Sequence, residues 1–259
     1  MPAPDPSFEP AVRDHKKNRN TAIVLVVTML LGGGLVLNAY ENWSRSQATD
    51  DRPAVVYRIT KERDLRILRQ DGQIANLFDL RGKVIALNAY SLQDPEIARR
   101  SLEVMKRLAE SRASTADLHL VSLIIDPIPS DKLFSTLATT ASTEGMKLPQ
   151  WWLGSNEPKT LHKFIKNELK VTTYPNDKLG KWDYDASIIL IDKNGHIRRA
   201  VIPQQRGGEP FIATFDFEKA AAWDAKGAKT GTARSNTEEL EVLINQTIDK
   251  LLAEPFPNP

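Results

Sequence analysis

A run of 20 residues near the start of the chain, from Thr21 to Tyr40, carries no charged side chain. Up to Leu37 every residue in this run is apolar, glycine or threonine. A helix of about 20 mostly apolar residues is long enough to cross the hydrocarbon core of a bilayer. The run therefore predicts a single transmembrane anchor over 21–40, through which the chain contacts the lipid bilayer.

The charges on the two sides of this run differ. The preceding segment is basic and holds Arg13, His15, Lys16, Lys17 and Arg19, whereas Tyr40, Glu41, Trp43 and Arg45 follow the run. Basic flanks stay on the cytoplasmic side, and Tyr and Trp favour the membrane interface. We therefore expect a cytoplasmic tail over 1–20, a tether over 41–53 and a periplasmic or extracytoplasmic domain, in a protein of the inner (cytoplasmic) membrane.

A cleaved signal peptide is the alternative interpretation of the same run. Leu37 and Ala39 would form a poor small-residue cleavage site. The apolar core of a signal peptide is roughly 7–15 residues long, which is shorter than this run. The length favours an anchor that is retained.

The chain contains no cysteine. This absence excludes disulfides, zinc–thiolate sites, iron–sulfur clusters and a cysteine nucleophile. The formal net charge of the 259-residue chain is only +2, which argues against a broad nucleic-acid-binding surface. We therefore expect no nucleic-acid partner and no thiol chemistry.

Strand and helix patterns alternate after the tether. Apolar runs predict buried strands over 84–90 and 118–125, and the apolar spacing from Ile97 to Leu108 predicts a helix over 96–111. Turn signals predict hairpins over 65–77 and 187–201. Further strands are expected over 54–59 and 151–153, and further helices over 130–143, 159–169 and 237–253, where Ser235 and Glu238 resemble a capping box.

This order predicts an α/β fold in which a central mixed sheet is flanked by helices, in one domain over 54–254. The stretch 204–234 is rich in glycine, alanine and charge and is expected to be an insertion. Within it, 211–217 alternates like a single strand.

Several segments resemble the Sco/SenC family, the thioredoxin-fold copper chaperones of cytochrome oxidase assembly. They are LFDLRGKV over 77–84, VSLIIDP over 121–127, WLG over 152–154 and IILIDKNG over 188–195. The Asp126-Pro127 pair is the most particular of these pieces. The resemblance covers about 54–201 and implies a thioredoxin-like fold.

The residues that match the family's copper ligands differ from the family. Asp94 and Ala98 stand at the two cysteine positions, and Tyr184 stands at the histidine position, with Ala186 there under a shifted alignment. Cu(I) prefers soft sulfur ligands over carboxylate or phenol oxygen. The sequence thus predicts a degenerate copper site with no cofactor, no metal ligand and no catalytic residue.

Other roles for residues near this position remain open. Asp94, with Asp183 or Asp185, offers oxygen ligands for a hard divalent cation. A simpler interpretation is that Asp94 caps a helix that starts at Pro95. Ser91 lacks the neighbouring glycines of a nucleophile elbow, and His119, His162 and His196 lack a ligand spacing and are expected to be structural or at the surface.

The function expected from the sequence is a noncatalytic, membrane-anchored binding or assembly module, with a possible link to respiratory oxidase assembly that rests on the resemblance alone. Its partner is expected to be a membrane or periplasmic protein. The candidate partner surface comprises Tyr90, Leu92, Pro95, Asp183 and Asp185, and the insertion 204–234 is a second candidate. The alternatives are a metal protein or enzyme with a new oxygen-ligand site, and a scaffold subunit of another membrane complex.

Overall fold

A computed structural model describes residues 15–49, 52–176, 181–203, 210–228 and 233–256. The chain divides into two compact units. Helix α1 (His15–Thr49) belongs to the first unit, and residues 51–202 with 211–259 form the second, called the sheet domain below.

Helix α1 contains a stretch, His15–Asn42, that is long and apolar enough to cross a membrane by length and composition. A signal sequence near an N-terminus passes the same test. The Thr28 hydroxyl donates to the Val24 carbonyl at 2.8 Å, so this polar group needs no partner from outside the helix. The helix continues to Thr49, so most of the segment expected as a tether over 41–53 is helical.

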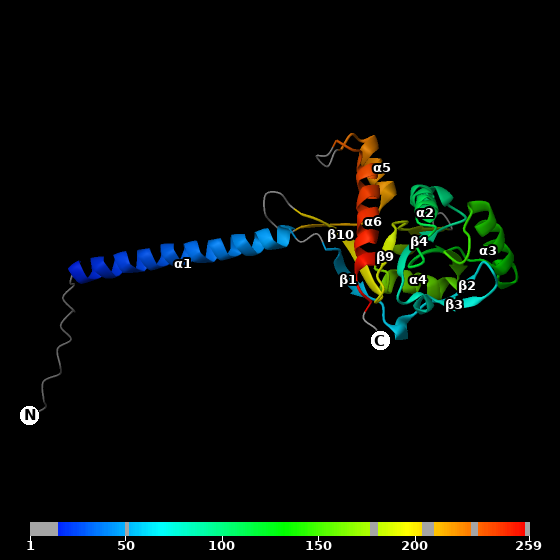
Figure 1. Ribbon diagram of the computed structural model, residues 1–259, viewed down its shortest axis with the longest axis horizontal. Helices are drawn as coiled ribbons and strands as arrows, with labels where there is room; N and C mark the ends of the chain where they lie inside the picture. Colours follow the sequence, from blue (N-terminus) through cyan, green and yellow to red (C-terminus); the bar gives the residue numbers. More distant parts are fainter. Residues whose placement is uncertain (1–14, 50–51, 177–180, 204–209, 229–232, 257–259) are drawn as a thin grey trace, which may run out of the picture. The chain divides into compact units, whose positions relative to one another are not determined.

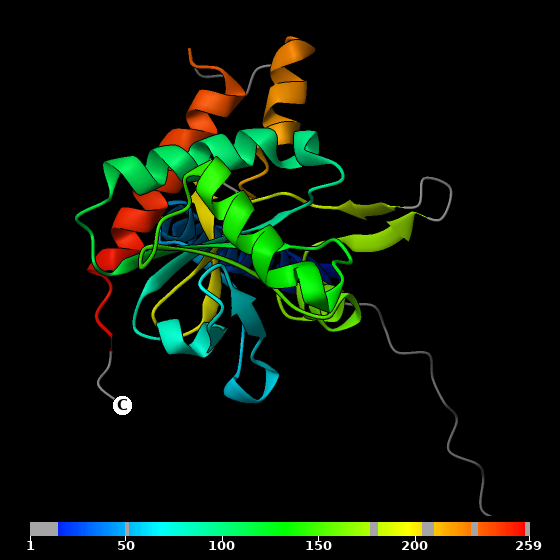
Figure 2. The ribbon, with the colours of Figure 1, turned by 90° about the vertical axis from the view of Figure 1, so that its right-hand side faces the viewer.

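The sheet domain is built on a mixed sheet with the strand order β1-β10-β9-β4-β5-β6-β2-β3, and β11 pairs with β10 (Figures 1 and 2). The strands are β1 (Ala54–Arg58), β2 (Arg66–Arg69), β3 (Ile74–Asn76), β4 (Val84–Tyr90), β5 (Leu118–Ile124), β6 (Trp151–Ser155), β9 (Ile189–Ile191), β10 (His196–Ile202) and β11 (Phe211–Ala213). β7 (Thr173–Asn176) and β8 (Lys181–Tyr184) form a separate ribbon. β4, β5 and β6 run parallel, and β9 and β10 run antiparallel to their neighbours.

Helices flank this sheet, which confirms the predicted α/β fold with a central mixed sheet. They are α2 (Arg99–Ser111), α3 (Ser130–Glu144), α4 (Pro158–Asn167), α5 (Phe217–Ala225) and α6 (Asn236–Ala253). α2, α5 and α6 gather on one side of the sheet (Figure 2). Short 3-10 turns stand at Lys61–Arg63, Leu77–Leu80 and Pro95–Ala98.

The central strands form because their sequences are apolar on both faces. All seven residues of β4 are buried, as expected for a parallel strand covered on each side. The polar members of this core bond to one another: the Ser122 hydroxyl donates to Asn88 Oδ1 at 2.7 Å, and the Trp151 indole N–H donates to Ser122 Oγ at 3.1 Å. Gly154 leaves room for Ile67 where β6 meets β2, since a Cβ there would lie 2.6 Å from Ile67 Cδ1.

The stretch expected as an insertion differs from its prediction. Only Phe211–Ala213 is a strand, and a helix begins at Phe217 because Asp216 caps it by accepting from the Lys219 amide at 2.9 Å. The part of the expected insertion over 204–209 and 229–232 lies outside the described residues.

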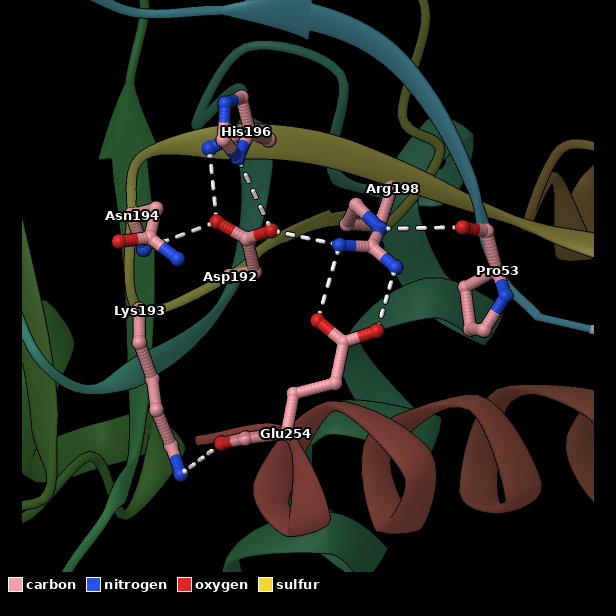
Figure 3. Close-up of polar contacts among 7 residues, drawn as sticks. All are labelled: Pro53, Asp192, Lys193, Asn194, His196, Arg198 and Glu254. Atoms are coloured by element: carbon pink, nitrogen blue, oxygen red, sulfur yellow. Dashed lines mark hydrogen bonds and ion pairs between the residues drawn. The ribbon is translucent and has the colours of Figure 1, made fainter. Parts of the chain in front are cut away.

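A buried guanidinium joins three distant parts of the sheet domain (Figure 3). Arg198 donates to Asp192 Oδ2 at 2.7 Å, to both carboxylate oxygens of Glu254 at 2.6 and 3.0 Å, and to the Pro53 carbonyl at 3.1 Å. The side chains of Arg198 and Asp192 are only 6% and 3% exposed. One cation therefore holds the residue before the edge strand β1, the β9–β10 turn and the end of α6.

We predict that Arg198→Ala lowers the free energy of unfolding by about 3–5 kcal/mol, because removing one partner leaves a buried charge uncompensated. The neighbouring half-buried Arg199 provides a matched control on the same strand, and Arg199→Ala is expected to change stability by no more than about 0.5 kcal/mol. Urea unfolding of the detergent-solubilised chain measures both. Equal effects of the two substitutions would contradict a central role for Arg198.

Candidate functional site

The pairing of β4 with β5 brings two loops together at the end of the sheet. Tyr90 lies opposite Ile124, and the Ile125 amide donates to the Tyr90 carbonyl at 3.0 Å. This register places Ser91 beside Asp126. The Ser91 hydroxyl donates to Asp126 Oδ1 at 2.8 Å, and the Leu92 amide donates to Asp126 Oδ2 at 2.6 Å.

Ser91 also closes the turn that follows it. Its hydroxyl oxygen accepts from the amides of Gln93 at 3.2 Å and Asp94 at 3.1 Å. A serine side chain that bonds to amides two and three residues ahead fixes the backbone in a turn. The chain then enters the 3-10 turn Pro95–Ala98, with Pro95 at its first position as predicted.

The predicted capping role of the Asp94 side chain is wrong. Asp94 occupies the N-cap position, but its carboxylate makes no capping hydrogen bond. The Ile97 amide, which a capping carboxylate could receive, donates to the Asp94 carbonyl at 3.4 Å. Asp94 contributes its backbone instead, because its carbonyl accepts from the Tyr184 hydroxyl at 3.2 Å.

Tyr184, at the end of β8, is 9% exposed and both roles of its hydroxyl are used. It donates to the Asp94 carbonyl and accepts from the Ser91 amide at 3.3 Å. Burial, with smaller contributions from Asp94, Asp126 and Tyr90, raises the pKa of this phenol above its ordinary value. The phenol therefore stays neutral, and a neutral, doubly hydrogen-bonded hydroxyl is a poor metal ligand.

The structure brings together two of the three positions that match the family's ligands. Asp94 and Tyr184 are in direct contact, and Ala98 lies at the end of the 3-10 turn with no exposed surface. Of the candidate partner surface, Pro95 is exposed and Leu92, Asp183 and Asp185 are partly exposed, but Tyr90 is only 4% exposed. Tyr90 therefore supports this surface from below.

A hollow of about 310 Å³ opens beside Tyr184, lined by acidic groups from β8 and α5. Its carboxylates already have donors from the protein. Asp185 accepts from the Ser187 amide at 2.8 Å, Asp216 caps α5, and Glu218 binds Arg100 at 2.8 Å. Burial raises the pKa of Asp216, because it disfavours the ionised form of this carboxyl. Among the residues that the structure describes, no group of three or more His, Cys, Asp or Glu is placed to hold a metal ion.

His162, on α4, packs behind this site, a contact that sequence patterns do not indicate. Its ring stacks on Trp182 with centroids 3.4 Å apart. Nε2 lies 3.1 Å from the Ile125 carbonyl and Nδ1 lies 2.6 Å from the Thr173 hydroxyl, so Nε2 donates and Nδ1 accepts. Burial lowers the pKa of the imidazole, which favours this neutral form. His162 is thus structural, as predicted, and has no free nitrogen to activate Ser91.

Comparisons with known proteins return similar structures but no similar sequence. No family model and no curated protein matches the chain. The chain resembles a SCO1/SenC family lipoprotein from Bacillus anthracis, at 18% identity and a TM-score of 0.45, over 61% of this chain and 90% of that one. It resembles copper-bound ScoI from Bradyrhizobium japonicum at 16% identity and a TM-score of 0.45, over 73% and 99% of the two chains.

Sco/SenC structures are thus among the matches, as the sequence resemblance predicted. A putative protein disulfide isomerase from Bacteroides thetaiotaomicron also matches, at 15% identity and a TM-score of 0.41, over 77% of this chain and 94% of that one. This chain has no cysteine, and disulfide exchange requires a thiolate.

We predict that Tyr184→Phe lowers the free energy of unfolding by about 1–3 kcal/mol, because the buried Ser91 amide and Asp94 carbonyl both lose a partner. Tyr174, which is 51% exposed on β7, provides the matched control, and Tyr174→Phe is expected to be near neutral. Urea unfolding compares the two. A neutral Tyr184→Phe would show that the phenol does not hold the loop.

Proposed function

We propose that this protein is a noncatalytic, membrane-anchored Sco-like module that binds a protein partner. The observation that carries the proposal is the hydrogen bonding of the loop after β4. The hydroxyls of Ser91 and Tyr184 and the carboxylate of Asp126 are all used within the protein. A site in which the polar groups satisfy one another provides a fixed surface and little reactivity.

The proposed location is the inner membrane, with the amino terminus in the cytoplasm and the sheet domain in the periplasm. The support is the basic segment before the apolar run and the presence of a helix that is long enough to span the bilayer. Such an anchor confines the sheet domain near the membrane, where a partner embedded in the same bilayer is met at high effective concentration.

The proposed contact surface is the exposed side of the loop Leu92–Pro95 together with Asp183 and Asp185. The loop part of this surface is held by buried neighbours, since the Asp126 carboxylate accepts from the Leu92 amide and the Tyr184 hydroxyl donates to the Asp94 carbonyl. A surface that is already ordered loses little conformational entropy when it binds. The partner proposed first is a respiratory-oxidase or copper-handling protein, because the segments quoted above resemble Sco/SenC proteins. A Sco protein among the similar structures is described as a member of a family of cytochrome c oxidase assembly proteins.

We predict that the purified chain takes up no Cu(I) beyond a detergent blank in competition with a chromogenic Cu(I) chelator. The chain has no thiolate, and the thioethers of Met105 and Met146 are buried. The triple variant Asp94→Cys, Ala98→Cys and Tyr184→His is expected to gain one equivalent, because it introduces two thiolates and an imidazole, ligands that Cu(I) prefers to carboxylate and phenol oxygen. Stoichiometric uptake by the unaltered chain would overturn the proposal.

We predict that Gln93→Arg reduces the recovery of the membrane partner severalfold when the tagged chain is purified from gently solubilised membranes. The substitution places a long cation on the proposed surface without touching the Ser91–Asp126 pair, because Gln93 enters that network only through its amide. Gln73→Arg, at an exposed glutamine in the β2–β3 turn, is the matched control. Equal recovery with both variants would exclude this surface, and recovery of a complex unrelated to oxidases would favour a scaffold role.

A further inference from the structure

Three large apolar side chains are exposed at one corner of the sheet domain. Phe211 and Ile212 on β11 are 54% and 46% exposed, and Trp223 on α5 is 41% exposed. Ile202, opposite Phe211 on β10, is partly exposed. These four residues are called the ribbon patch below. Because solitary exposed apolar residues are common, the arrangement of the four decides whether the patch has a role.

The two strands of the ribbon present apolar groups on both of their faces. β10 and β11 pair Ile202 with Phe211 and Val201 with Ile212, so Phe211 and Ile212 point to opposite sides. On the Phe211 side, the ribbon and Trp223 border a hollow of about 220 Å³ whose wall includes Leu240 and Leu243 of α6. A ribbon that is apolar on both faces is unusual at a water-exposed sheet corner, where one face is normally polar.

Helix α5, which carries Trp223, is fixed to α6 next to this hollow. The Asp224 carboxylate accepts from the amides of Asn236 and Thr237 at 2.7 and 3.0 Å and from the Thr237 hydroxyl at 2.7 Å. These bonds lower the pKa of Asp224 to about 2. The patch therefore lies on an ordered support and does not have to fold before it binds.

The acidic groups of the hollow have partners within the protein. Asp216 caps α5, and Glu239 pairs with Arg234 at 3.5 Å. Lys219 lies over the Trp223 ring, with its ammonium 5.4 Å from the ring centroid. A Trp–Lys pair beside exposed Phe and Ile matches the aromatic and basic composition found at membrane interfaces.

A short path, along the chain and across one strand pair, connects the end of the apolar run with the ribbon patch. Ala54, at the start of β1, is paired with Arg199, and Ile202 is three residues further along the same strand, or about 10 Å away. Nine residues of α1 follow Tyr40, and five more steps lead from Thr49 to Ala54. Together they extend at most about 30 Å. The path from the end of the apolar run to Ile202, along the chain to Ala54, across the β1–β10 pair and along β10, is therefore at most about 45 Å long.

We propose that the ribbon patch binds the surface of the lipid bilayer in which α1 is anchored, with Phe211, Ile212 and Trp223 at the level of the headgroups. The inference rests on the proposed membrane anchor. Because the anchor keeps the patch near the bilayer, the patch binds the lipid at a high effective concentration. A small contact area is therefore sufficient for stable binding. Seating would restrict the orientation of the sheet domain over the membrane.

The absence of cysteine allows a direct test on the full chain. A single cysteine is introduced by Ile212→Cys and labelled with a polarity-sensitive fluorophore in vesicles of phosphatidylethanolamine and phosphatidylglycerol. Ile74→Cys is the matched control, since Ile74 is 57% exposed on β3 at the opposite edge of the same sheet. We expect blue-shifted emission at position 212 and severalfold stronger quenching there by brominated lipid than at position 74.

Two further measurements distinguish failure of the membrane anchor from failure of the lipid contact. Alkaline extraction of the vesicles reports whether α1 anchors the chain. A chain that stays with the vesicles while positions 212 and 74 are quenched equally by aqueous iodide would overturn the lipid contact and leave the anchor intact. Release of the chain by alkali would overturn both. Adding Trp223→Ser and Phe211→Ser to the Ile212→Cys chain is expected to return the emission at position 212 to that of the control.

Discussion

The register of the parallel β4–β5 pair determines the chemistry of the site. Because Tyr90 pairs with Ile124, the residues that follow these two strands emerge side by side, and the Ser91 hydroxyl meets the Asp126 carboxylate at 2.8 Å. Tyr184 then closes the loop from a third direction. A one-residue change in register would turn these side chains to the other face of the sheet and dismantle the network.

This network holds the loop after β4 without sulfur. The backbone of the loop is fixed by a serine, an aspartate and a phenol that satisfy one another. Each of these groups alone would be costly to bury, and together they stabilise the loop. Arg198 performs a similar role near the start of β10, where it joins Pro53, Asp192 and Glu254.

The sequence predicted those parts of the fold that are encoded locally. The strands over 84–90 and 118–124 follow from continuous apolar runs, and the β9–β10 hairpin follows from a turn in which Gly195 has a positive φ. The capping box of Ser235 and Glu238 at the start of α6 is present as predicted. The bonds of Asp126 to the loop after β4, the stacking of His162 on Trp182 and helix α5 were missed. The Asp126 bonds and the His162–Trp182 stacking join residues that are distant in sequence. Helix α5 begins at Phe217, the last residue of the stretch whose alternation indicated a strand.

The contact between Gly154 and Ile67 has a consequence for the history of this chain. The hairpin β2–β3 adds to the sheet at β6, where the bare backbone of Gly154 leaves room for the Ile67 side chain. We therefore expect the side-chain sizes at positions 154 and 67 to vary together among homologues of this protein. Where a larger residue replaces the glycine, a smaller partner at position 67, or loss of the whole hairpin, is the compensation that geometry allows.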